Sequence, residues 1–307
     1  MSPARTDAQQ AVAARLGRVG VWTFTLDPRP WAEASAIAAE IESLGYGAIW
    51  IPETVGRDAL VSSTLLLGAT GRIAVATGIA SIWGRDAVAM ACGHKTVAEA
   101  FPGRFVLGLG VSHAPMVEGL RGQVYERPVA TMRAYLEKMD ATPYMAAPPI
   151  DPPVRVLAAL GPRMLDLAGE ASAGVHNYFV PPEHTAVARE HLGAGPVLAP
   201  EQAVCLAPDA DEGRRIARSH MRTYLRLPNY ANNLRRLGFT DDDLTGDGSD
   251  RLADAIVAWG DEAAIVARVR AHLDAGADHV CVQVLGHDPS AAPIDAWRRL
   301  APALTSI

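Results

Sequence analysis

Lysine is nearly absent from this sequence. Of its 28 basic residues only Lys95 and Lys138 are lysine, and both lie in segments with helical periodicity. An enzyme that works through a lysine Schiff base would therefore have just two candidates for its nucleophile. A basic excess is also lacking, since 28 Lys and Arg stand against 34 Asp and Glu and the net charge is −6. We therefore expect no nucleic acid as a partner.

The sequence has few cysteines and no long apolar run. The three cysteines, Cys92, Cys205 and Cys281, are odd in number and far apart, which favours reduced thiols in a cytosolic protein over disulfides. The sequence holds no apolar stretch of about 18 residues. Its first residues, MSPARTDAQQAVAARLGRVG, contain no apolar core of signal-peptide length. We expect a cytoplasmic protein that does not cross a membrane.

The 307 residues do show a regular alternation of short β-rich runs with helical patterns of ten or more residues. The expected strands are residues 18–24, 47–51, 72–79, 104–110, 154–159, 174–180, 202–207 and 278–285. Runs such as IAVATGI and HVCVQV lack polar alternation, as strands covered on both faces do. Eight such βα units predict a (β/α)8 TIM barrel.

The alternative architecture, a doubly wound parallel sheet, fits less well. Such a sheet holds about six strands and usually carries a glycine-rich first βα turn, whereas the first turn here reads WTFTLDPRP. We expect one domain over residues 1–307, with a flexible N-terminal arm at 1–16. Residues 209–259, between the seventh and eighth strands, predict a helical insertion over the barrel mouth, with the acidic TDDDLTGDGSD as a solvated loop.

Several catalytic motifs begin in this sequence but are incomplete. GLGVSH at residues 108–113 starts like a dinucleotide fingerprint, but His113 stands at the third glycine position. Residues 110–114 are one position from a nucleophile elbow, yet no acid and histidine partners can be assigned to Ser112. The sequence also has no P-loop, HExxH or CxxC motif, so we expect no metal site.

The C-terminal ends of the eight expected strands would form the mouth of the barrel, where active sites of this architecture lie. Few of these ends carry charge: they offer one or two carboxylates, two histidines, several glycines and aromatic residues. Such a mouth suits a flat organic cofactor better than a metal cluster. Gly161 and Pro162, at a strand-to-helix turn, would present backbone N–H groups to a phosphate, unless they only start a helix.

One long segment resembles a known family. In residues 72–119 a strand ends in TGI, an arginine follows within a few residues, and a helix leads to PGRFVLGLG. Together with EIESLGYGAIWIPE before it and YERPVATMRAYLEKM and LAALGPRMLDLAGEASAGV after it, this segment resembles the bacterial luciferase-like monooxygenase superfamily, in particular its branch that uses the deazaflavin coenzyme F420. The resemblance covers residues 18–180 well and GADHVCVQV more weakly. It implies a TIM barrel that binds FMN or F420 at its C-terminal mouth and moves a hydride between cofactor and substrate.

The resemblance also implies roles for residues at the strand ends. Gly78 and Ile79 would form a bulge, often with a cis peptide bond, that presses on one face of the cofactor ring; a plain β-bulge is the alternative. The other cofactor-binding residues would line the ribityl and phosphate side: Gly110, Val111, Ser112, Ala159, Leu160 and Gly161. Trp22, Asn177 and Tyr178 would contact the substrate or the carbonyl edge of the ring, although Trp22 would serve equally as a core residue.

Two residues are candidates for a catalytic, acid–base role. His113 falls where relatives place a proton-transferring residue, and an imidazole exchanges protons near neutral pH; its alternative is to hydrogen-bond a loop. Glu53 ends the second strand, where F420 enzymes often carry Asp followed by His, but here Thr54 replaces that histidine. Glu53 would bind the ring edge or lie at the rim as a solvated carboxylate.

These residues favour an F420-dependent oxidoreductase that moves a hydride between deazaflavin C5 and a small organic substrate. Two alternatives stay open: an FMN-dependent monooxygenase that uses oxygen, and a non-catalytic barrel that binds F420 or pairs with another subunit. A homodimer is plausible, because members of the family associate through barrel helices. The substrate would be recognised mainly by residues 177–286, which carry the least resemblance.

Overall fold

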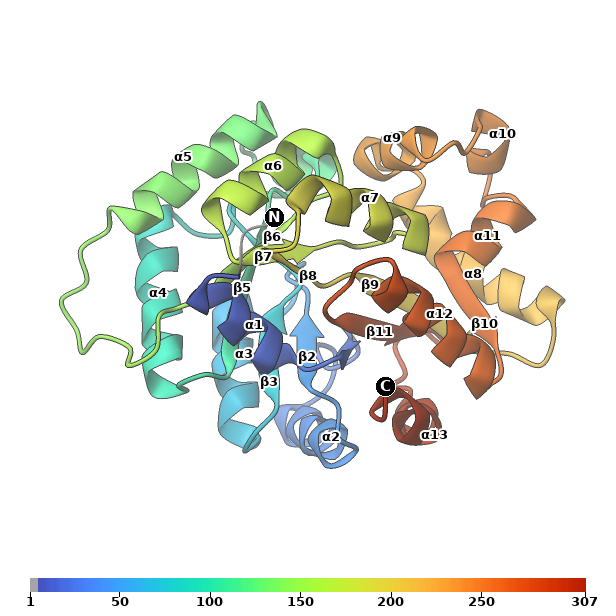
Figure 1. Ribbon diagram of the computed structural model, residues 1–307, viewed down its shortest axis with the longest axis horizontal. Helices are drawn as coiled ribbons and strands as arrows, with labels where there is room; N and C mark the ends of the chain where they lie inside the picture. Colours follow the sequence, from blue (N-terminus) through green and yellow to red (C-terminus); the bar gives the residue numbers. More distant parts are fainter. Residues whose placement is uncertain (1–4) are drawn as a thin grey trace.

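Parallel strands form the centre of the molecule, shown in Figure 1. The computed structural model describes residues 5–307. Its strands are β1 (Val19–Trp22), β2 (Ala48–Ile51), β3 (Ala74–Thr77), β4 (Ala80–Ser81), β5 (Phe105–Gly110), β6 (Arg155–Ala158), β7 (Gly174–His176), β8 (Val197–Leu198), β9 (Glu201–Leu206), β10 (Val257–Gly260) and β11 (Val280–Val284). They lie in the order β10-β9-β11-β1-β2-β3-β5-β6-β7-β8, with β4 beside β5, and every pair is parallel.

The sheet curls because β8 and β9, which lie near opposite ends of the strand order, are consecutive in the chain. Only Ala199 and Pro200 separate β8 from β9. The amide of Ala199 donates to Val175 O in β7 at 2.9 Å, and the amide of Cys281 in β11 donates to Pro200 O at 3.0 Å. The eight expected strands therefore follow one another round a curled parallel sheet. The structure adds three short strands to them, β4, β8 and β10.

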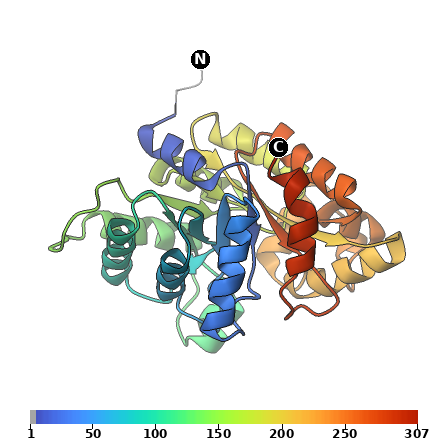
Figure 2. The ribbon, with the colours of Figure 1, turned by 90° about the horizontal axis from the view of Figure 1, so that it is seen from below.

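Helices cover the outside of this sheet. They are α1 (Asp7–Leu16), α2 (Trp31–Ser43), α3 (Ala59–Ala69), α4 (Ala87–Ala100), the π-helical turn η1 (Pro115–Leu120), α5 (Pro128–Asp140), α6 (Pro162–Ala171), α7 (Pro182–Leu192), α8 (Ala210–Tyr224), α9 (Pro228–Arg236), α10 (Asp241–Leu244), α11 (Asp250–Ile256), α12 (Glu262–Asp274) and α13 (Ile294–Leu304). Figure 2 shows α2 and α13 side by side, where the Tyr46 hydroxyl donates to Trp297 O at 3.0 Å. Across residues 5–307, no helix has the length and apolar character needed to cross a bilayer.

Residues 7–16, which the sequence analysis places in a flexible arm, form the helix α1. Thr6 and Gln9 make a capping box, in which the Thr6 hydroxyl accepts from Gln9 N at 3.3 Å and the Gln9 side chain accepts from Thr6 N at 2.9 Å. Val12 and Leu16 are fully buried against the strands. The helix escapes prediction because its apolar stripe is narrow and otherwise made of alanine. Residues 1–4 of the expected arm lie outside the described residues.

The segment between β9 and β10 is helical. Its helices α8, α9, α10 and α11 surround a separate apolar cluster that includes Leu234 and Leu252. The strand β10 is not expected from the sequence, because it follows α11 directly and no turn residue marks the change. It pairs with the last four residues of β9 and so widens that end of the sheet.

The acidic segment 240–250, expected to be a solvated loop, contains the short helix α10. Asp243 is buried there instead of solvated. Its carboxylate accepts from Thr240 N at 2.9 Å and from the Ser249 hydroxyl at 2.7 Å, and it pairs with Arg251 at 2.7 Å. These hydrogen bonds hold the pKa of Asp243 well below its usual range, at about 2. Local capping therefore orders a segment whose composition alone suggests a loop.

A chain of aromatic side chains fills part of the interior of the curled sheet. Trp50 donates from Nε1 to His279 Nε2 at 3.0 Å, and His279 Nδ1 lies 2.9 Å from Gly17 O. The indole of Trp50 also stacks on His176, with ring centroids 4.3 Å apart. Gly20 leaves room for the chain, since a Cβ there would lie 2.8 Å from the His279 ring. These contacts fix the place of the His176 imidazole.

Candidate functional site

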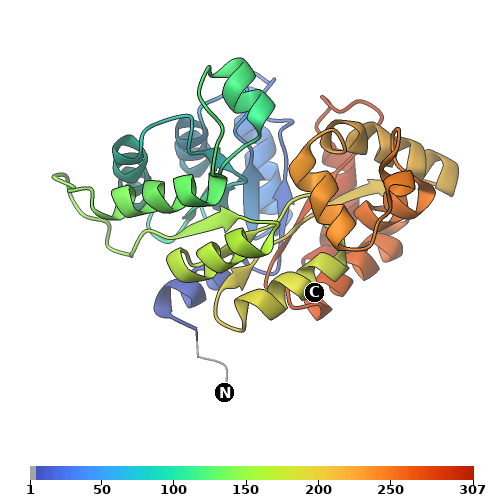
Figure 3. The ribbon, with the colours of Figure 1, turned by 90° about the horizontal axis from the view of Figure 1, so that it is seen from above.

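A cavity of about 1220 Å³ lies at the C-terminal ends of the strands, where the sequence predicts the site. Side chains from η1, α8 and α9 complete its wall, and Figure 3 shows η1 and α9 at the end of the molecule opposite α1. Twelve of the thirteen predicted site residues line it: Trp22, Glu53, Gly78, Ile79, Gly110, Val111, Ser112, His113, Ala159, Leu160, Gly161 and Tyr178. The exception is Asn177.

Gly78 and Ile79, which we call the bulge, present backbone to this cavity. The peptide bond between them is cis, as the family resemblance implies. The amide of Gly78 donates to Ile51 O at 2.7 Å, and the amide of Glu53 donates to Ile79 O at 3.2 Å. On another side, Trp22 Nε1 donates to Gly78 O at 3.1 Å. Neighbouring strands therefore hold the bulge through its backbone groups.

Two glycines are required for the packing around the bulge. A Cβ on Gly78 would lie 2.7 Å from Trp22 Nε1, and a Cβ on Gly110 would lie 2.5 Å from Ile79 Cδ1. Both distances are shorter than a side-chain carbon tolerates, so a side chain at either place would displace the bulge or its supports. The absence of these side chains leaves a face of backbone and Ile79 open to a flat ligand.

Glu53 lies in the cavity wall, and its carboxylate already has partners in the protein. It forms a buried ion pair with Arg85, which also pairs with Asp58, and it accepts from Ser81 N at 2.7 Å. Burial alone would lower the pKa of Arg85, but the two carboxylates outweigh burial and raise it. Because the Glu53 side chain is buried, the solvated-rim role does not describe this geometry. Glu53 joins the end of β2 to the segment that follows β3.

His113 follows β5 and lies at the start of η1. Its Nδ1 is 3.2 Å from Asn229 Oδ1 in α9, so Nδ1 carries the proton and donates. Nε2 makes no hydrogen bond to residues 5–307. Burial lowers the pKa of His113, and the Asn229 contact opposes this only in part. At neutral pH the side chain is therefore a neutral imidazole whose Nε2 can accept a proton.

The loop between β5 and η1 is held by aromatic donors. The Trp83 indole donates to Val111 O at 2.8 Å, and the Tyr125 hydroxyl donates to Ser112 O at 3.4 Å. Ser112 has φ of 54°, a left-handed conformation that non-glycine residues adopt only when their surroundings hold it. The loop therefore has a defined shape beside the cavity, as a binding loop requires.

The far end of the cavity carries positive charge. Gly161 caps α6, and a Cβ on it would lie 3.4 Å from the Arg236 guanidinium. Arg163, in the first turn of α6, also lines the cavity. No carboxylate in the described part of the chain comes within ion-pair distance of either arginine. A helix N-terminus with an uncompensated guanidinium beside it favours an anion such as a phosphate.

Tyrosines form another wall. The Tyr178 hydroxyl lies 2.8 Å from the Tyr224 hydroxyl and 2.8 Å from Gln283 Oε1. Its ring packs against Trp22, with centroids 4.9 Å apart. Tyr230 packs edge-on to Tyr224 at 5.4 Å. The cavity is therefore lined here by aromatic rings, and the hydroxyls of Tyr178 and Tyr224 are already hydrogen-bonded, which suits an organic ligand.

Asn177 does not reach the cavity. It is fully buried, and its amide nitrogen donates to Ala159 O, which positions the end of β6. Side chains along a strand alternate between its two faces, and here His176 and Tyr178 face the cavity while Asn177 faces away. The sequence analysis did not single out the following cavity residues: Asp27, His176, Tyr224, Tyr230 and Arg236. Because side chains two positions apart on a strand share a face, the prediction of Tyr178 as a site residue could also have predicted His176.

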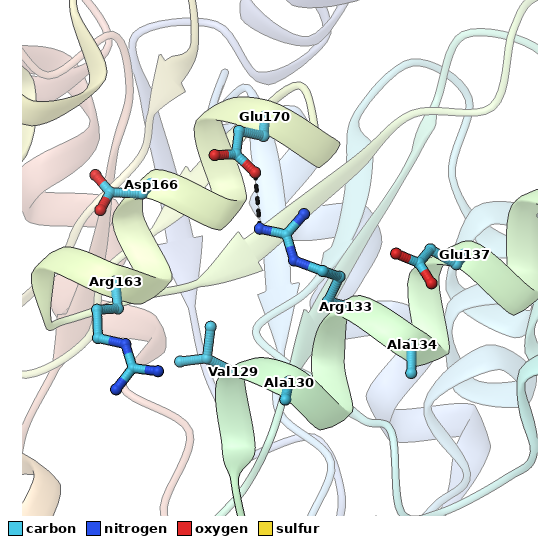
Figure 4. Close-up of a pocket in the computed structure, with 8 residues that line it drawn as sticks. All are labelled: Val129, Ala130, Arg133, Ala134, Glu137, Arg163, Asp166 and Glu170. Atoms are coloured by element: carbon cyan, nitrogen blue, oxygen red, sulfur yellow. Dashed lines mark hydrogen bonds and ion pairs between the residues drawn. The ribbon is translucent and has the colours of Figure 1, made fainter.

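A second, smaller pocket of about 440 Å³ lies between α5 and α6 and is drawn in Figure 4. It shares Val129 and Arg163 with the large cavity. Its other arginine, Arg133, points at Glu170 and pairs with it at 2.8 Å. Because three carboxylates face two guanidiniums here, this pocket offers an anion no net attraction. Nor do three or more possible metal ligands cluster anywhere in residues 5–307.

Comparison with known proteins identifies the class. A family model described as luciferase-like monooxygenase matches residues 15–279 of this chain. Because the match spans most of the chain, the protein belongs to the luciferase-like monooxygenase family. The curled parallel sheet and the cavity at its C-terminal edge agree with that membership.

Individual relatives are more distant. A protein of Mycobacterium tuberculosis named as a coenzyme F420-dependent oxidoreductase is 26% identical over 208 residues, which cover 58% of this chain and 59% of the relative. A 5,10-methylenetetrahydromethanopterin reductase of Methanolobus tindarius is 29% identical over 172 residues, which cover 50% of this chain and 52% of the relative. The chain thus spans between half and three fifths of the length of the curated relatives it matches.

The fold has clear counterparts among solved structures. An F420-dependent secondary alcohol dehydrogenase in complex with an F420–acetone adduct superposes with a TM-score of 0.75 at 14% identity. The superposition covers 94% of this chain and 98% of that one. At this identity the similarity establishes the architecture alone.

Proposed function

We propose that this protein is an F420-dependent oxidoreductase that moves a hydride between C5 of the deazaflavin ring and a small organic substrate. The observation that carries the proposal is the bulge, where two glycine-dependent contacts leave backbone facing a cavity of about 1220 Å³. Pockets for drug-sized ligands run from about 300 to 1000 Å³. This one has room for a three-ring cofactor together with a substrate. The curated relatives named for F420 and for a related reductase support the choice of cofactor.

The residues present fit such a cofactor at both of its ends. A flat ring can rest on the bulge, whose shape depends on Gly78 and Gly110, since a Cβ at either would clash with Trp22 or Ile79. The cofactor phosphate would meet the N-terminus of α6 at Gly161 and the guanidinium of Arg236. When bound, F420 would supply or accept the hydride, while the protein binds and orients it and excludes water.

Glu53 takes a positioning role in this proposal. Its ion pair with Arg85 anchors the end of β2, from which the Glu53 amide donates to Ile79 O. The pair therefore helps to hold the bulge in place, where it would support the ring. Placing a reacting ring within about 1 Å of its partner is worth orders of magnitude in rate.

His113 is the proposed acid–base residue. Oxidation of an alcohol by hydride transfer also releases a proton, and the free Nε2 of a neutral imidazole can accept it. In the reverse direction the same nitrogen returns the proton to the carbonyl oxygen. Asn229 holds Nδ1 protonated and so keeps the lone pair on Nε2.

The cavity walls favour a substrate without formal charge. Phe24, Leu227 and Tyr224 contribute apolar surface, and Tyr178 commits its hydroxyl to Gln283. Burying an unpaired charge among such groups would cost several kcal/mol. A small alcohol, carbonyl compound or imine is the class of substrate that suits these walls.

Turnover assays test the proposed function. Oxidised F420 would be mixed with small alcohols, and reduced F420 with carbonyl compounds and imines, under anaerobic conditions while the absorbance of oxidised F420 is followed. We expect turnover with at least one pair, slowed about 100-fold in His113→Gln with F420 binding retained. Oxygen uptake with reduced FMN and no reaction with F420 would replace the proposal with a monooxygenase. F420 binding without turnover in any pair would indicate a non-catalytic barrel.

The homodimer and the cytoplasmic location are predictions that stand beside the proposed function. The structure adds one feature to the first of them. Val61 and Leu65 on α3 and Val88 on α4 are exposed, and the two helices are neighbours. An apolar surface on adjacent barrel helices is a place where a second copy of this chain could pack.

A further inference from the structure

His176 ends β7 and is held rigidly inside the barrel. Only 1% of it is exposed. Its Nδ1 lies 2.8 Å from Ala199 O, and its ring stacks on Trp50 at 4.3 Å with an angle of 16° between the planes. A carbonyl oxygen can only accept, so Nδ1 carries the proton and Nε2 carries a lone pair. Both the tautomer and the orientation of the ring are thus determined by the fold.

The Nε2 atom of His176 has no partner in the described residues. It faces the bulge, since a Cβ on Gly78 would lie 3.0 Å from it, and His176 lines the large cavity. The neighbouring donor cannot satisfy it, because Trp22 Nε1 is committed to Gly78 O at 3.1 Å. The wall of the cavity beside the bulge therefore holds an oriented, unpaired acceptor.

Such an atom is unusual in a folded protein. Most buried polar groups have a hydrogen-bond partner, and leaving one unpaired costs about 1–3 kcal/mol. Burial also lowers the pKa of His176 to about 4, so at neutral pH Nε2 is not protonated and remains an acceptor without a partner. A ligand that brings a donor to this point would remove the cost on binding.

We propose that Nε2 of His176 accepts a hydrogen bond from an N–H or O–H group of the cofactor and thereby fixes the ring on the bulge. The inference rests on the proposed function and adds to it a binding residue and the chemistry of its partner. Deazaflavin cofactors carry such donors in the pyrimidine ring and the ribityl chain. A ligand with no donor at this point leaves the nitrogen unpaired, so the contact also selects among ligands.

Two substitutions separate this contact from a structural role of the same residue. His176→Asn keeps a δ-position N–H for Ala199 O but has no atom at the ε position. His176→Gln places an oxygen acceptor near the ε position but loses the δ-position donor. If His176 only supports the fold, Asn should preserve F420 binding better than Gln. If Nε2 binds the cofactor, the order is reversed.

The measurement is a fluorescence titration of the full-length protein with F420. We expect the Kd of His176→Gln to stay within about twofold of wild type and that of His176→Asn to rise about three- to tenfold, the value of one neutral hydrogen bond. Equal affinity of the two variants, or tighter binding by the Asn variant, would overturn the inference. If wild type itself binds no F420, the proposed function fails instead.

A second measurement covers the case in which a variant does not fold. In wild-type protein with 15N-labelled histidine, the Nε2 resonance of His176 should move when F420 is added, because an unprotonated nitrogen that gains a hydrogen-bond donor changes its shielding. An unchanged Nε2 resonance at saturating F420 would contradict the inference. His279, whose Nε2 already accepts from Trp50, provides the internal control.

Discussion

Replacing Gly78 with alanine should damage cofactor binding. The new Cβ would lie 2.7 Å from Trp22 Nε1 and 3.0 Å from His176 Nε2, whereas ordinary contacts begin near 3.4 Å. A gap of about 0.7 Å must therefore open. Trp22 cannot retreat without losing its bond to Gly78 O, and His176 is held by Ala199 O.

The expected cost of Gly78→Ala follows from this geometry. Overpacking of a rigid site costs about 1–3 kcal/mol, and because the bulge must move to relieve it, that cost falls on the surface that carries the ring. We expect the Kd for F420 to rise at least tenfold and turnover to fall about 100-fold. Gly119→Ala is the matched control, since a Cβ there meets nothing within 4 Å. Wild-type F420 affinity in Gly78→Ala would refute the assignment of the bulge as the ring support.

Four further changes test other parts of the account. Arg236→Gln should weaken F420 binding about tenfold in a titration, because it removes a charge-assisted contact to phosphate; unchanged affinity would place the phosphate elsewhere. In the oxidation direction, kcat/KM of wild type should fall at acidic pH as His113 becomes protonated, with a midpoint below pH 6.5. His113→Gln should lose this acidic decrease in the pH profile of kcat/KM. Burial raises the pKa of Glu201 to about 8 in the folded protein, whereas its pKa in the unfolded chain is near 4.5, so Glu201 lowers the free energy of unfolding increasingly as the pH rises above 4.5. In urea unfolding, Glu201→Gln should therefore stabilise the protein by about 3 kcal/mol at pH 7 and by little at pH 4. If two copies pack through α3, Leu65→Glu should halve the mass seen by light scattering, and a wild-type monomer would rule the dimer out.

The barrel strands and most of the cavity could be predicted because their signals are local. Apolar runs bounded by glycine and proline mark each strand, and the end of a strand is where a barrel places its site. This reasoning places twelve of thirteen predicted residues around one cavity. It fails at Asn177, where the direction of a side chain depends on the register of β7 and not on residue type.

The rest depends on contacts between distant parts of the chain. Glu53 and Arg85 are 32 positions apart, and only the fold shows that they form an ion pair. Arg236 and Tyr224 reach the cavity because of how α8 and α9 pack. Helix α1 owes its order to buried Val12 and Leu16, which contact strands far along the chain. None of these contacts has a pattern in the local sequence.

Titration of the purified protein with F420, and in parallel with FMN, distinguishes the proposed cofactor from its alternative. We expect saturable F420 binding at micromolar or lower concentration, with FMN binding much more weakly. Tight binding of FMN without F420 binding would contradict the proposed cofactor while leaving the family membership intact. Binding of neither would contradict the proposal that this cavity holds a flavin-like ring at all.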